Sequence, residues 1–194
     1  SLNDTVKALN VDGAPATVEA IKAGEYKVAR PFNLATKGEI SEAARDFMDF
    51  ILSAEGQKVV EENGYIASVE DAQPYAGTAF GKVVVAGSSS VTPVMEKLKE
   101  AYLVLHPEAE IEIQMSDSTT GMQSAIDGIC DIGMASRELK DSELEKGLTP
   151  TVLAIDGIAV IVHPDNPVEE MTGETIRKIF TGEILTWEEA GATK

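Results

Sequence analysis

The sequence predicts an α/β fold in which a mixed sheet is flanked by helices. Short apolar runs alternate with amphipathic helical patterns through the second half of the chain, and small polar turns separate them. Strands interleaved with helices are typical of such a layered fold. The 194 residues, of which 43% are hydrophobic, suffice for one good-sized core. We therefore expect one main α/β body.

The first part of the chain predicts an extended segment followed by two helices. Residues 26–35 are extended around Pro31, and a helix follows from about Ser41 with apolar residues at helical spacing. A second helical run ends at Asn63-Gly64. Residues 69–81 contain proline and glycine without periodicity, so we interpret them as a linker between segments 1–68 and 82–194.

The segment after this linker alternates strands and helices. The strand patterns cover residues 82–86, 110–115, 131–135 and 151–162, the last with a bend at Asp156-Gly157. The helical patterns cover residues 92–105, 119–127, 141–146 and 172–180. Thr186 to Glu189 resembles a capping box and predicts a last short helix.

The strong negative charge limits the classes of partner. The formal net charge is −17, from 33 acidic and 16 basic residues. Such a chain repels nucleic acid, so we expect no nucleic-acid partner. A bound anion has to be held by local donors, because charges beyond about 8–10 Å are largely screened at physiological salt.

Three polar turns in the second segment follow strands and share one design. They carry Ser88, Ser89 and Ser90 in the first turn, Ser118 and Thr119 in the second, and Ser136 and Arg137 in the third. Ligands of open α/β sheets collect outside the carboxyl ends of strands. Helix N-termini favour anions, and arginine binds oxyanions with two parallel hydrogen bonds. The turns therefore predict a binding site for a tetrahedral oxyanion.

Each turn also has a plain structural interpretation. The serines and threonines of the first two turns are suited to cap helices. Arg137 lies beside Glu138 and Asp141, so an ordinary surface ion pair is an alternative for it. The occurrence of all three turns at successive strand ends favours the binding site.

Other candidate sites are weaker. His106 and His163 are each isolated, so we expect surface histidines and neither a metal site nor a cofactor. Cys130 is the one cysteine and is expected to be a buried small apolar residue. The serine turn lacks the lysine of a nucleotide-binding loop.

Several motifs resemble the phosphate-binding proteins of bacterial phosphate ABC transporters. The second segment resembles the amino-terminal half of that family in the stretches VVVAGSSSVTPVMEKL, SDSTTGMQSAIDG, DIGMASREL, AIDGIAVIVHPDNPVE and IRKIFTGEILTWEE. The first segment resembles the family's carboxyl-terminal part in VKALNVDGA, EYKVARPFNLATKGE and FILSAEGQKVVEENGYI. The carboxyl-terminal part therefore stands before the amino-terminal part, and the middle of the family sequence, with its Glu-Gly-Ser-Gly-Thr-Arg turn, has no counterpart here.

The unusual order fits either a fragment across the junction of tandem copies or an engineered permutant. The irregular 69–81 joint favours the tandem junction. The family's type II periplasmic-binding-protein fold has two lobes joined by hinge strands, so the two segments together are expected to form about one lobe with the hinge. A remnant of the second lobe is expected near residues 171–194, and its uncovered surface favours a homodimer formed by segment exchange.

The resemblance implies capture of inorganic phosphate outside the cell membrane and delivery to a membrane permease, without any chemical step. Ser89 matches the family's hydroxyl donor at the first helix, Ser90 a neighbouring amide donor, and Ser118 the second-turn donor. Ser136-Arg137 falls where some relatives carry an aspartate that accepts a proton from phosphate. Arg137 therefore implies that the anion is bound through charge. For this incomplete chain we expect weak or no binding.

Two other functions stay open from the sequence. A phosphatase with Ser89 as nucleophile requires a general base and leaving-group stabilisation, and neither histidine lies near the serine turns. A surface or signalling module that kept the lobe and abandoned transport is the third possibility. Phosphate binding that is unchanged in an Arg137→Ala variant would favour that module.

Overall fold

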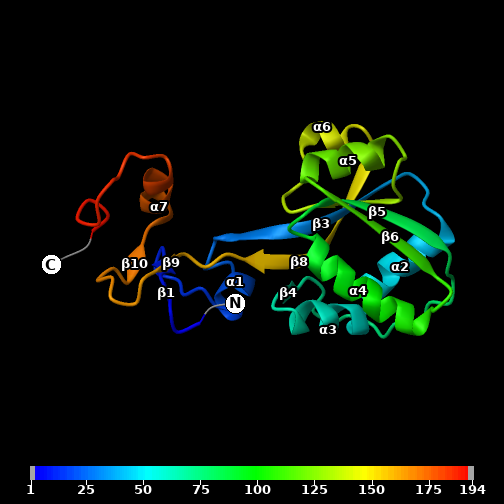
Figure 1. Ribbon diagram of the computed structural model, residues 1–194, viewed down its shortest axis with the longest axis horizontal. Helices are drawn as coiled ribbons and strands as arrows, with labels where there is room; N and C mark the ends of the chain where they lie inside the picture. The colour runs from blue at the N-terminus through cyan, green and yellow to red at the C-terminus, as the bar shows by residue number, and fades with distance from the viewer. Residues whose placement is uncertain (1–2, 192–194) are drawn as a thin grey trace. The chain divides into compact units, whose positions relative to one another are not determined.

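The computed structural model describes residues 3–191 and contains two compact units (Figure 1). The larger unit comprises residues 30–156, and the smaller unit comprises residues 1–29 together with 157–194. The chain therefore passes from one unit to the other twice, after residue 29 and after residue 156.

The larger unit is built on a six-stranded mixed sheet with the strand order β4-β8-β3-β7-β5-β6. Its strands are β3 (Ala29–Lys37), β4 (Ile66–Ala67), β5 (Lys82–Ser88), β6 (Glu110–Ser116), β7 (Ile132–Ala135) and β8 (Leu148–Gly157). Strand β5 pairs in parallel with β6 and β7, whereas β3 is antiparallel to β7 and β4 is antiparallel to β8. This mixed sheet confirms the predicted fold class.

Helices cover both faces of this sheet (Figure 1). One face carries α2 (Glu42–Leu52), α3 (Ala54–Glu62) and α4 (Thr92–Leu105), and the other carries α5 (Ser118–Ile126) and α6 (Asp141–Leu144). The first face holds the main core, in which Phe47, Ile51 and Leu98 are fully buried. A smaller core around Met122 and Leu139 lies under α5 and α6. It includes Cys130, whose predicted burial is confirmed.

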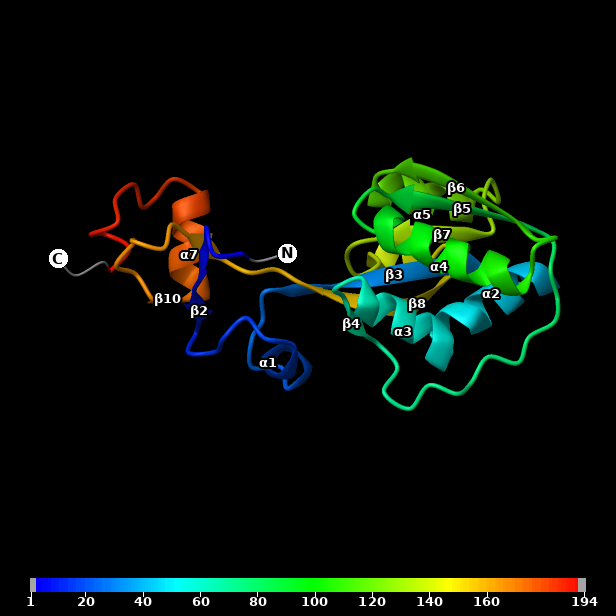
Figure 2. The same ribbon diagram turned by 60° about the horizontal axis from the view of Figure 1, so that its bottom comes forward.

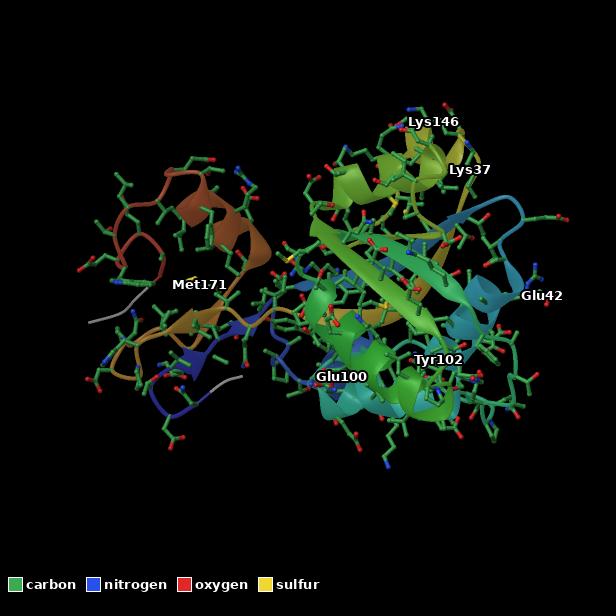
Figure 3. The ribbon with its side chains drawn as sticks, turned by 45° about the vertical axis from the view of Figure 1, so that its right-hand side comes forward. Lys37, Glu42, Glu100, Tyr102, Lys146 and Met171 are labelled. Atoms are coloured by element: carbon green, nitrogen blue, oxygen red, sulfur yellow. The ribbon has the colours of Figure 1, made fainter. Side chains whose placement is uncertain are left out.

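The segment between β4 and β5, residues 68–81, forms a long loop without helix or strand (Figure 2). The carboxylate of Asp46 on α2 anchors it. Asp46 Oδ1 accepts a hydrogen bond from the Ala79 amide at 3.1 Å, and Oδ2 accepts one from the Tyr75 hydroxyl. Tyr102, near the end of α4 (Figure 3), donates to the same Oδ2 at 2.8 Å. The carboxylate itself is almost fully buried.

His106 belongs to this buried group, so the expectation of a surface histidine is wrong for it. Its side chain is 11% exposed, and Nε2 lies 2.7 Å from the Tyr75 hydroxyl. The ring also packs on Tyr102 at a centroid distance of 4.7 Å. His163 is 72% exposed, as predicted.

Within its described residues, 3–29 and 157–191, the smaller unit contains two short strand pairs and two helices. Strand β1 (Lys7–Ala8) is antiparallel to β9 (Ile161–Val162), and β2 (Asn10–Val11) is parallel to β10 (Glu170–Met171). Helices α1 (Val18–Lys22) and α7 (Gly173–Phe180) pack with them around two small apolar clusters. Thr172 caps α7, because its hydroxyl accepts a hydrogen bond from the Thr175 amide.

Two sequence expectations are wrong in this region. The strand expected over residues 151–162 is divided into β8 and β9, and residues 158–160 between them belong to neither strand. The helix expected after Thr186 is a series of turns. The capping contacts are present, since Glu189 accepts from the Leu185 and Thr186 amides. Gly191, the last described residue, has a positive φ of 98°, which lies outside the helical range.

Candidate functional site: an oxyanion site at the carboxyl ends of three strands

The sheet brings the three predicted turns to one edge. Strands β6, β5 and β7 are neighbours and run parallel, so their carboxyl ends meet. Ser88 pairs with Ser116 of β6, and Gly87 pairs with Met134 of β7. The turns that follow these residues therefore start at nearly the same level of the sheet.

Two glycines allow α5 to lie directly on this edge. Gly87 at the end of β5 has a positive φ of 137°. A Cβ added to Gly121 of α5 would lie 2.5 Å from Gly87 Cα and 2.8 Å from the Ala86 carbonyl oxygen. Only glycine fits such a close approach of helix and strand, and this packing positions the amino-terminal end of α5 beside the end of β5.

The amino-terminal end of α4 is open to a ligand. The residue before the helix, Val91, provides no side-chain cap, and proline occupies the first turn. Ser89 is exposed and Ser90 half-buried in the turn just before it. The first amides of a helix lack partners within the helix and carry partial positive charge. The end of this 14-residue helix can therefore hold an anion.

Ser88 has a structural role in the same turn. It is 2% exposed, and its carbonyl oxygen accepts hydrogen bonds from the Val91 amide and the Thr92 hydroxyl. The Ser89 amide is also engaged, since it donates to the Ser116 carbonyl at 2.9 Å. These bonds fix the conformation of the turn. The side chains of Ser89 and Ser90 remain as the groups that the turn presents to a ligand.

The amino-terminal end of α5, by contrast, already holds a carboxylate. Asp117 Oδ1 accepts from the amides of Thr119 and Thr120 at 2.8 and 3.0 Å, and Oδ2 accepts from the Thr120 hydroxyl at 2.6 Å. These bonds, chiefly the one from the Thr120 hydroxyl, hold the pKa of Asp117 below its ordinary value. The cap of this helix is therefore Asp117, which the sequence analysis did not single out although aspartate is a preferred N-cap residue.

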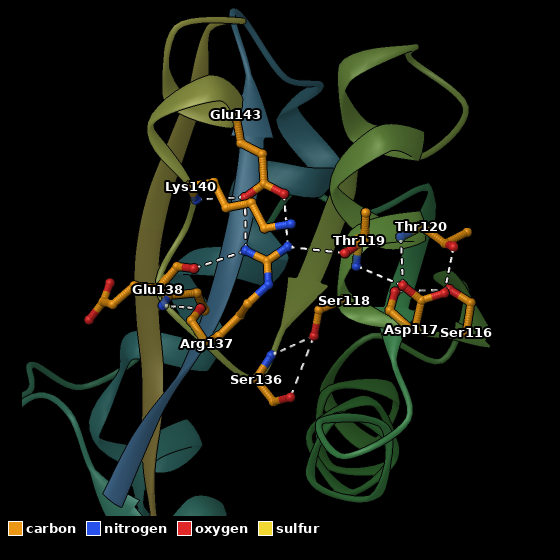
Figure 4. A network of polar contacts seen from close by, with 11 residues as sticks. Ser116, Asp117, Ser118, Thr119, Thr120, Ser136, Arg137, Glu138, Lys140 and Glu143 are labelled. Carbon is orange, nitrogen blue, oxygen red and sulfur yellow. Dashed lines mark hydrogen bonds and ion pairs between the residues drawn. The ribbon is translucent and has the colours of Figure 1, made fainter.

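Side chains connect the second and third turns (Figure 4). The Ser136 amide donates to Ser118 Oγ at 3.1 Å, and the two hydroxyl oxygens lie 3.5 Å apart. Arg137 Nη2 lies 3.4 Å from the Thr119 hydroxyl oxygen. The predicted residues of these two turns are thus in contact, with Ser118 and Ser136 half-buried and Thr119 exposed.

The Arg137 guanidinium points toward Glu143 of α6 (Figure 4). Nη1 and Nη2 donate to the two carboxylate oxygens of Glu143 at 2.9 and 2.8 Å, and the glutamate is 7% exposed. The hydrogen bonds from Arg137 are the main reason that the pKa of Glu143 lies below its ordinary value. The partner of Arg137 is therefore Glu143, a residue that the sequence analysis did not consider.

The one histidine of the larger unit, His106, lies at the carboxyl-terminal end of α4, whereas the first turn precedes the amino-terminal end of that helix. His106 is bonded to Tyr75 and packed against Tyr102. Among residues 3–191, no group of three or more His, Cys, Asp or Glu side chains is placed to hold a metal ion. The same part of the chain contains no helix that is long and apolar enough to cross a membrane.

Two known families match the two segments of the chain. Residues 72–194 match the PBP superfamily domain, and residues 4–66 match bacterial extracellular solute-binding proteins. The chain is 55% identical over 189 residues to the phosphate-binding protein PstS 2 of Streptococcus agalactiae, which covers 96% of this chain and 64% of that protein. The corresponding identity to PstS 2 of Streptococcus pneumoniae is 39%, covering 97% of this chain and 65% of that protein. The chain thus spans a little under two thirds of the length of these relatives.

Two solved structures are similar to this one. A phosphate-binding protein of a phosphate ABC transporter from Streptococcus pneumoniae superposes with a TM-score of 0.92 at 39% identity, over 98% of this chain and 74% of that one. A substrate-binding protein from Clostridium perfringens with bound phosphate gives a TM-score of 0.51 at 43% identity, over 58% of this chain and 46% of that one. The names are those of binding proteins and not of enzymes, in agreement with the expectation from sequence. The chain belongs to the phosphate-binding protein family of phosphate ABC transporters, within the PBP superfamily.

Proposed function

We propose that this chain contributes to the capture of inorganic phosphate, and that the phosphate contacts lie at the three turns described above. The observation that carries the proposal is the uncapped amino-terminal end of α4, with Ser89 and Ser90 before it. Ser118 and Ser136 extend this array of donors from the neighbouring strand ends. The phosphate bound to the relative from Clostridium perfringens supports the choice of ligand.

Neutral donors are suited to this strongly acidic chain. Hydroxyl and amide groups bind an oxyanion through short hydrogen bonds, and distant carboxylates are screened by salt. In this proposal Ser89, Ser90, Ser118 and Ser136 face the anion, while Ser88 fixes the first turn. Thr119 and Arg137 border the site, because Arg137 contacts both Thr119 and Glu143.

The whole protein is proposed to be the solute-binding component of an ABC importer, which delivers phosphate to a membrane permease. The match of residues 4–66 to extracellular solute-binding proteins supports a location on the outer side of the cell membrane. We further propose that segments 1–68 and 82–194 form about one lobe with the hinge strands and a remnant of a second lobe. The larger unit, which contains residues from both segments, supports this assignment.

The order of the segments is proposed to be natural. A single relative from Streptococcus agalactiae aligns over 189 residues that include both segments, which supports a natural origin over an engineered permutation. Sequencing of the encoding gene would test whether further copies flank this region, as the tandem-junction origin requires.

We expect weak phosphate affinity, in the millimolar range, for this chain alone. Three or four charge-assisted hydrogen bonds contribute roughly 5–12 kcal/mol in total, at about 1.5–3 kcal/mol each. Association costs roughly 4 kcal/mol or more, and a half-site open to water loses part of the remainder. Calorimetry that gives a submicromolar dissociation constant would contradict this expectation.

A homodimer formed by segment exchange is proposed as a way to cover the smaller unit. Phe180 of α7 is 85% exposed, Leu185 is 83% exposed and Trp187 is 48% exposed. Exposed apolar residues at this density favour association. Light scattering of the purified chain tests the dimer, and a monomer at all concentrations up to the solubility limit would exclude it.

Phosphate titration followed by NMR tests the proposed site. Amide resonances of Ser89, Ser90, Ser118 and Ser136 should shift together with increasing phosphate, and Ser89→Ala should weaken the response. The control is Thr78→Ala, an exposed hydroxyl in the loop before the start of β5, which should leave the titration unchanged. Shifts that are absent, or that occur only far from the three turns, would refute the proposed function.

A further inference from the structure

Arg137 is paired with Glu143, so it is not the free cation that the sequence suggests. Each Nη atom of Arg137 makes two hydrogen bonds: Nη1 to Glu143 Oε2 and the Glu138 carbonyl, and Nη2 to Glu143 Oε1 and the Thr119 hydroxyl. The four Nη hydrogens thus have partners within the protein. Two of these hydrogens bond to a buried carboxylate, and a ligand that used those two would have to break these bonds.

Glu143 is itself held in place independently of Arg137. Its Oε2 also accepts a hydrogen bond from the Lys140 amide at 2.8 Å, at the start of α6. The carboxylate therefore has three short hydrogen bonds and little exposure, and it lies on the short helix α6. Such a rigid carboxylate fixes the direction of a planar guanidinium that binds it with two bonds.

The pair also cancels charge next to the anion site. The positive charge of Arg137 faces the negative charge of Glu143 at 2.8 Å. Asp117 is the other acidic group that acts on Arg137, and Lys140 is the other basic group that acts on Glu143. Glu143 is the carboxylate that contacts the guanidinium directly, and it is almost fully buried. An anion at the three turns meets little net positive charge from Arg137.

We propose that Glu143 is a positioning residue that fixes Arg137 between the second and third turns and neutralises its charge. Hydroxyl and amide donors, and not a free guanidinium, then recognise the anion. The inference rests on the proposed function. It deepens that function by assigning selectivity to the geometry of neutral donors. It also predicts that removal of the carboxylate charge strengthens anion binding, whereas loss of a merely structural residue weakens it.

The main test compares Glu143→Gln with Glu145→Gln by phosphate titration at low and high NaCl. Glu145 is the matched control, because it is an exposed glutamate two residues further along the chain. Glu143→Gln uncovers the Arg137 charge, so we expect about three- to tenfold tighter phosphate binding at low salt and a steeper salt dependence. Glu145→Gln should change the affinity by less than about twofold, since its charge is screened.

Two further variants separate charge from structure. Glu143→Asp keeps the charge and should keep the wild-type salt dependence. The double variant Arg137→Gln/Glu143→Gln removes both charges and should return the salt dependence to that of the wild type. Equal weakening by Arg137→Gln and Glu143→Gln, with an unchanged salt dependence, would overturn the proposal, because it would make Arg137 a direct ligand that Glu143 only orients.

A measurement without ligand distinguishes this inference from the proposed function. Thr119 links Asp117 to Arg137, because its amide donates to Asp117 and its hydroxyl contacts Arg137 Nη2. NMR can follow the titration of Asp117. Glu143→Gln should lower the pKa of Asp117, and Glu145→Gln should leave it in place. A wild-type chain that shows no phosphate response refutes the proposed function. An Asp117 pKa that is equal in wild type and Glu143→Gln refutes charge compensation, and with it this proposal.

Discussion

Substitution of the buried carboxylate of Asp46 by an amide should destabilise the larger unit and release the 68–81 loop. Asp46 accepts hydrogen bonds from the Tyr75 and Tyr102 hydroxyls and from the Ala79 amide. A bond to a charged group contributes about 1.5–3 kcal/mol, against about 0.5–1.5 kcal/mol for a neutral one. Asp46→Asn therefore weakens three bonds by about 1 kcal/mol each, and its NH₂ group has to face one of the three donors.

The expected loss is about 2–4 kcal/mol in the free energy of unfolding. For a chain of this size, each kcal/mol lowers Tm by about 2–4 °C, so calorimetry should show a decrease of roughly 5–15 °C. Hydrogen exchange should at the same time become faster in residues 72–80, because the Ala79 amide and the Tyr75 hydroxyl lose their charged partner.

Asp49→Asn is the control for this prediction. Asp49 lies on the same helix three residues later and is exposed. Both variants remove one negative charge from α2, so their difference isolates the buried hydrogen bonds. If Asp46→Asn lowers Tm no more than Asp49→Asn does, or leaves exchange of the loop unchanged, the carboxylate does not anchor the loop and the reasoning is refuted.

Three further predictions concern packing, alkaline pH and the cap of α5. Gly121→Ala should destabilise the chain by about 1–3 kcal/mol in chemical denaturation, because its Cβ would lie 2.5 Å from Gly87 Cα; a neutral effect would show that α5 can shift away from β5. Burial is the main cause that raises the pKa of Tyr75 and Tyr102 well above the ordinary value of about 10, so the stability they contribute is complete below about pH 10 and is lost as pH rises further. An absorbance titration should show their ionisation only together with unfolding, and reversible ionisation of the folded chain near pH 10 would contradict this. Asp117→Ala should lower stability and tighten phosphate binding at low salt, because it frees two amides and removes a negative charge; weaker binding in an NMR titration would contradict it.

The elements of the larger unit could be predicted from sequence because each has a strong local pattern. Helix α4 covers the same residues as expected, 92–105, because its apolar positions recur at helical spacing and Pro93 marks its first turn. Strands β5 and β6 extend slightly beyond the expected ends, to Ser88 and Ser116. The three site turns follow from these elements, since a parallel pairing of neighbouring strands was sufficient to place them at one edge.

The wrong predictions concern residues whose structure depends on contacts with distant parts of the chain. His106 is followed by proline at the end of a helix, which locally resembles an exposed terminus. Its burial depends on Tyr75, which lies 31 residues earlier in a loop without periodicity. No local pattern predicts such a partner. The short strands β1, β2, β9 and β10 have two residues each and pair across more than 150 residues of chain, so they too lack a local signal.

The predicted site residues differ in how far the structure supports a binding role, and the difference has one physical origin. Two helices begin at the edge of the sheet, and each start offers unpaired amides. At α5 the chain supplies its own anion, because Asp117 accepts from two of these amides. At α4 Val91 supplies none, and the serines before it are small and uncharged. An external anion therefore stabilises the start of α4, which has no anion of its own, more than it would stabilise the start of α5. The same reasoning applies to Arg137, whose charge Glu143 already balances. The start of α4, with Ser89 and Ser90 before it, is therefore where we propose that the anion binds.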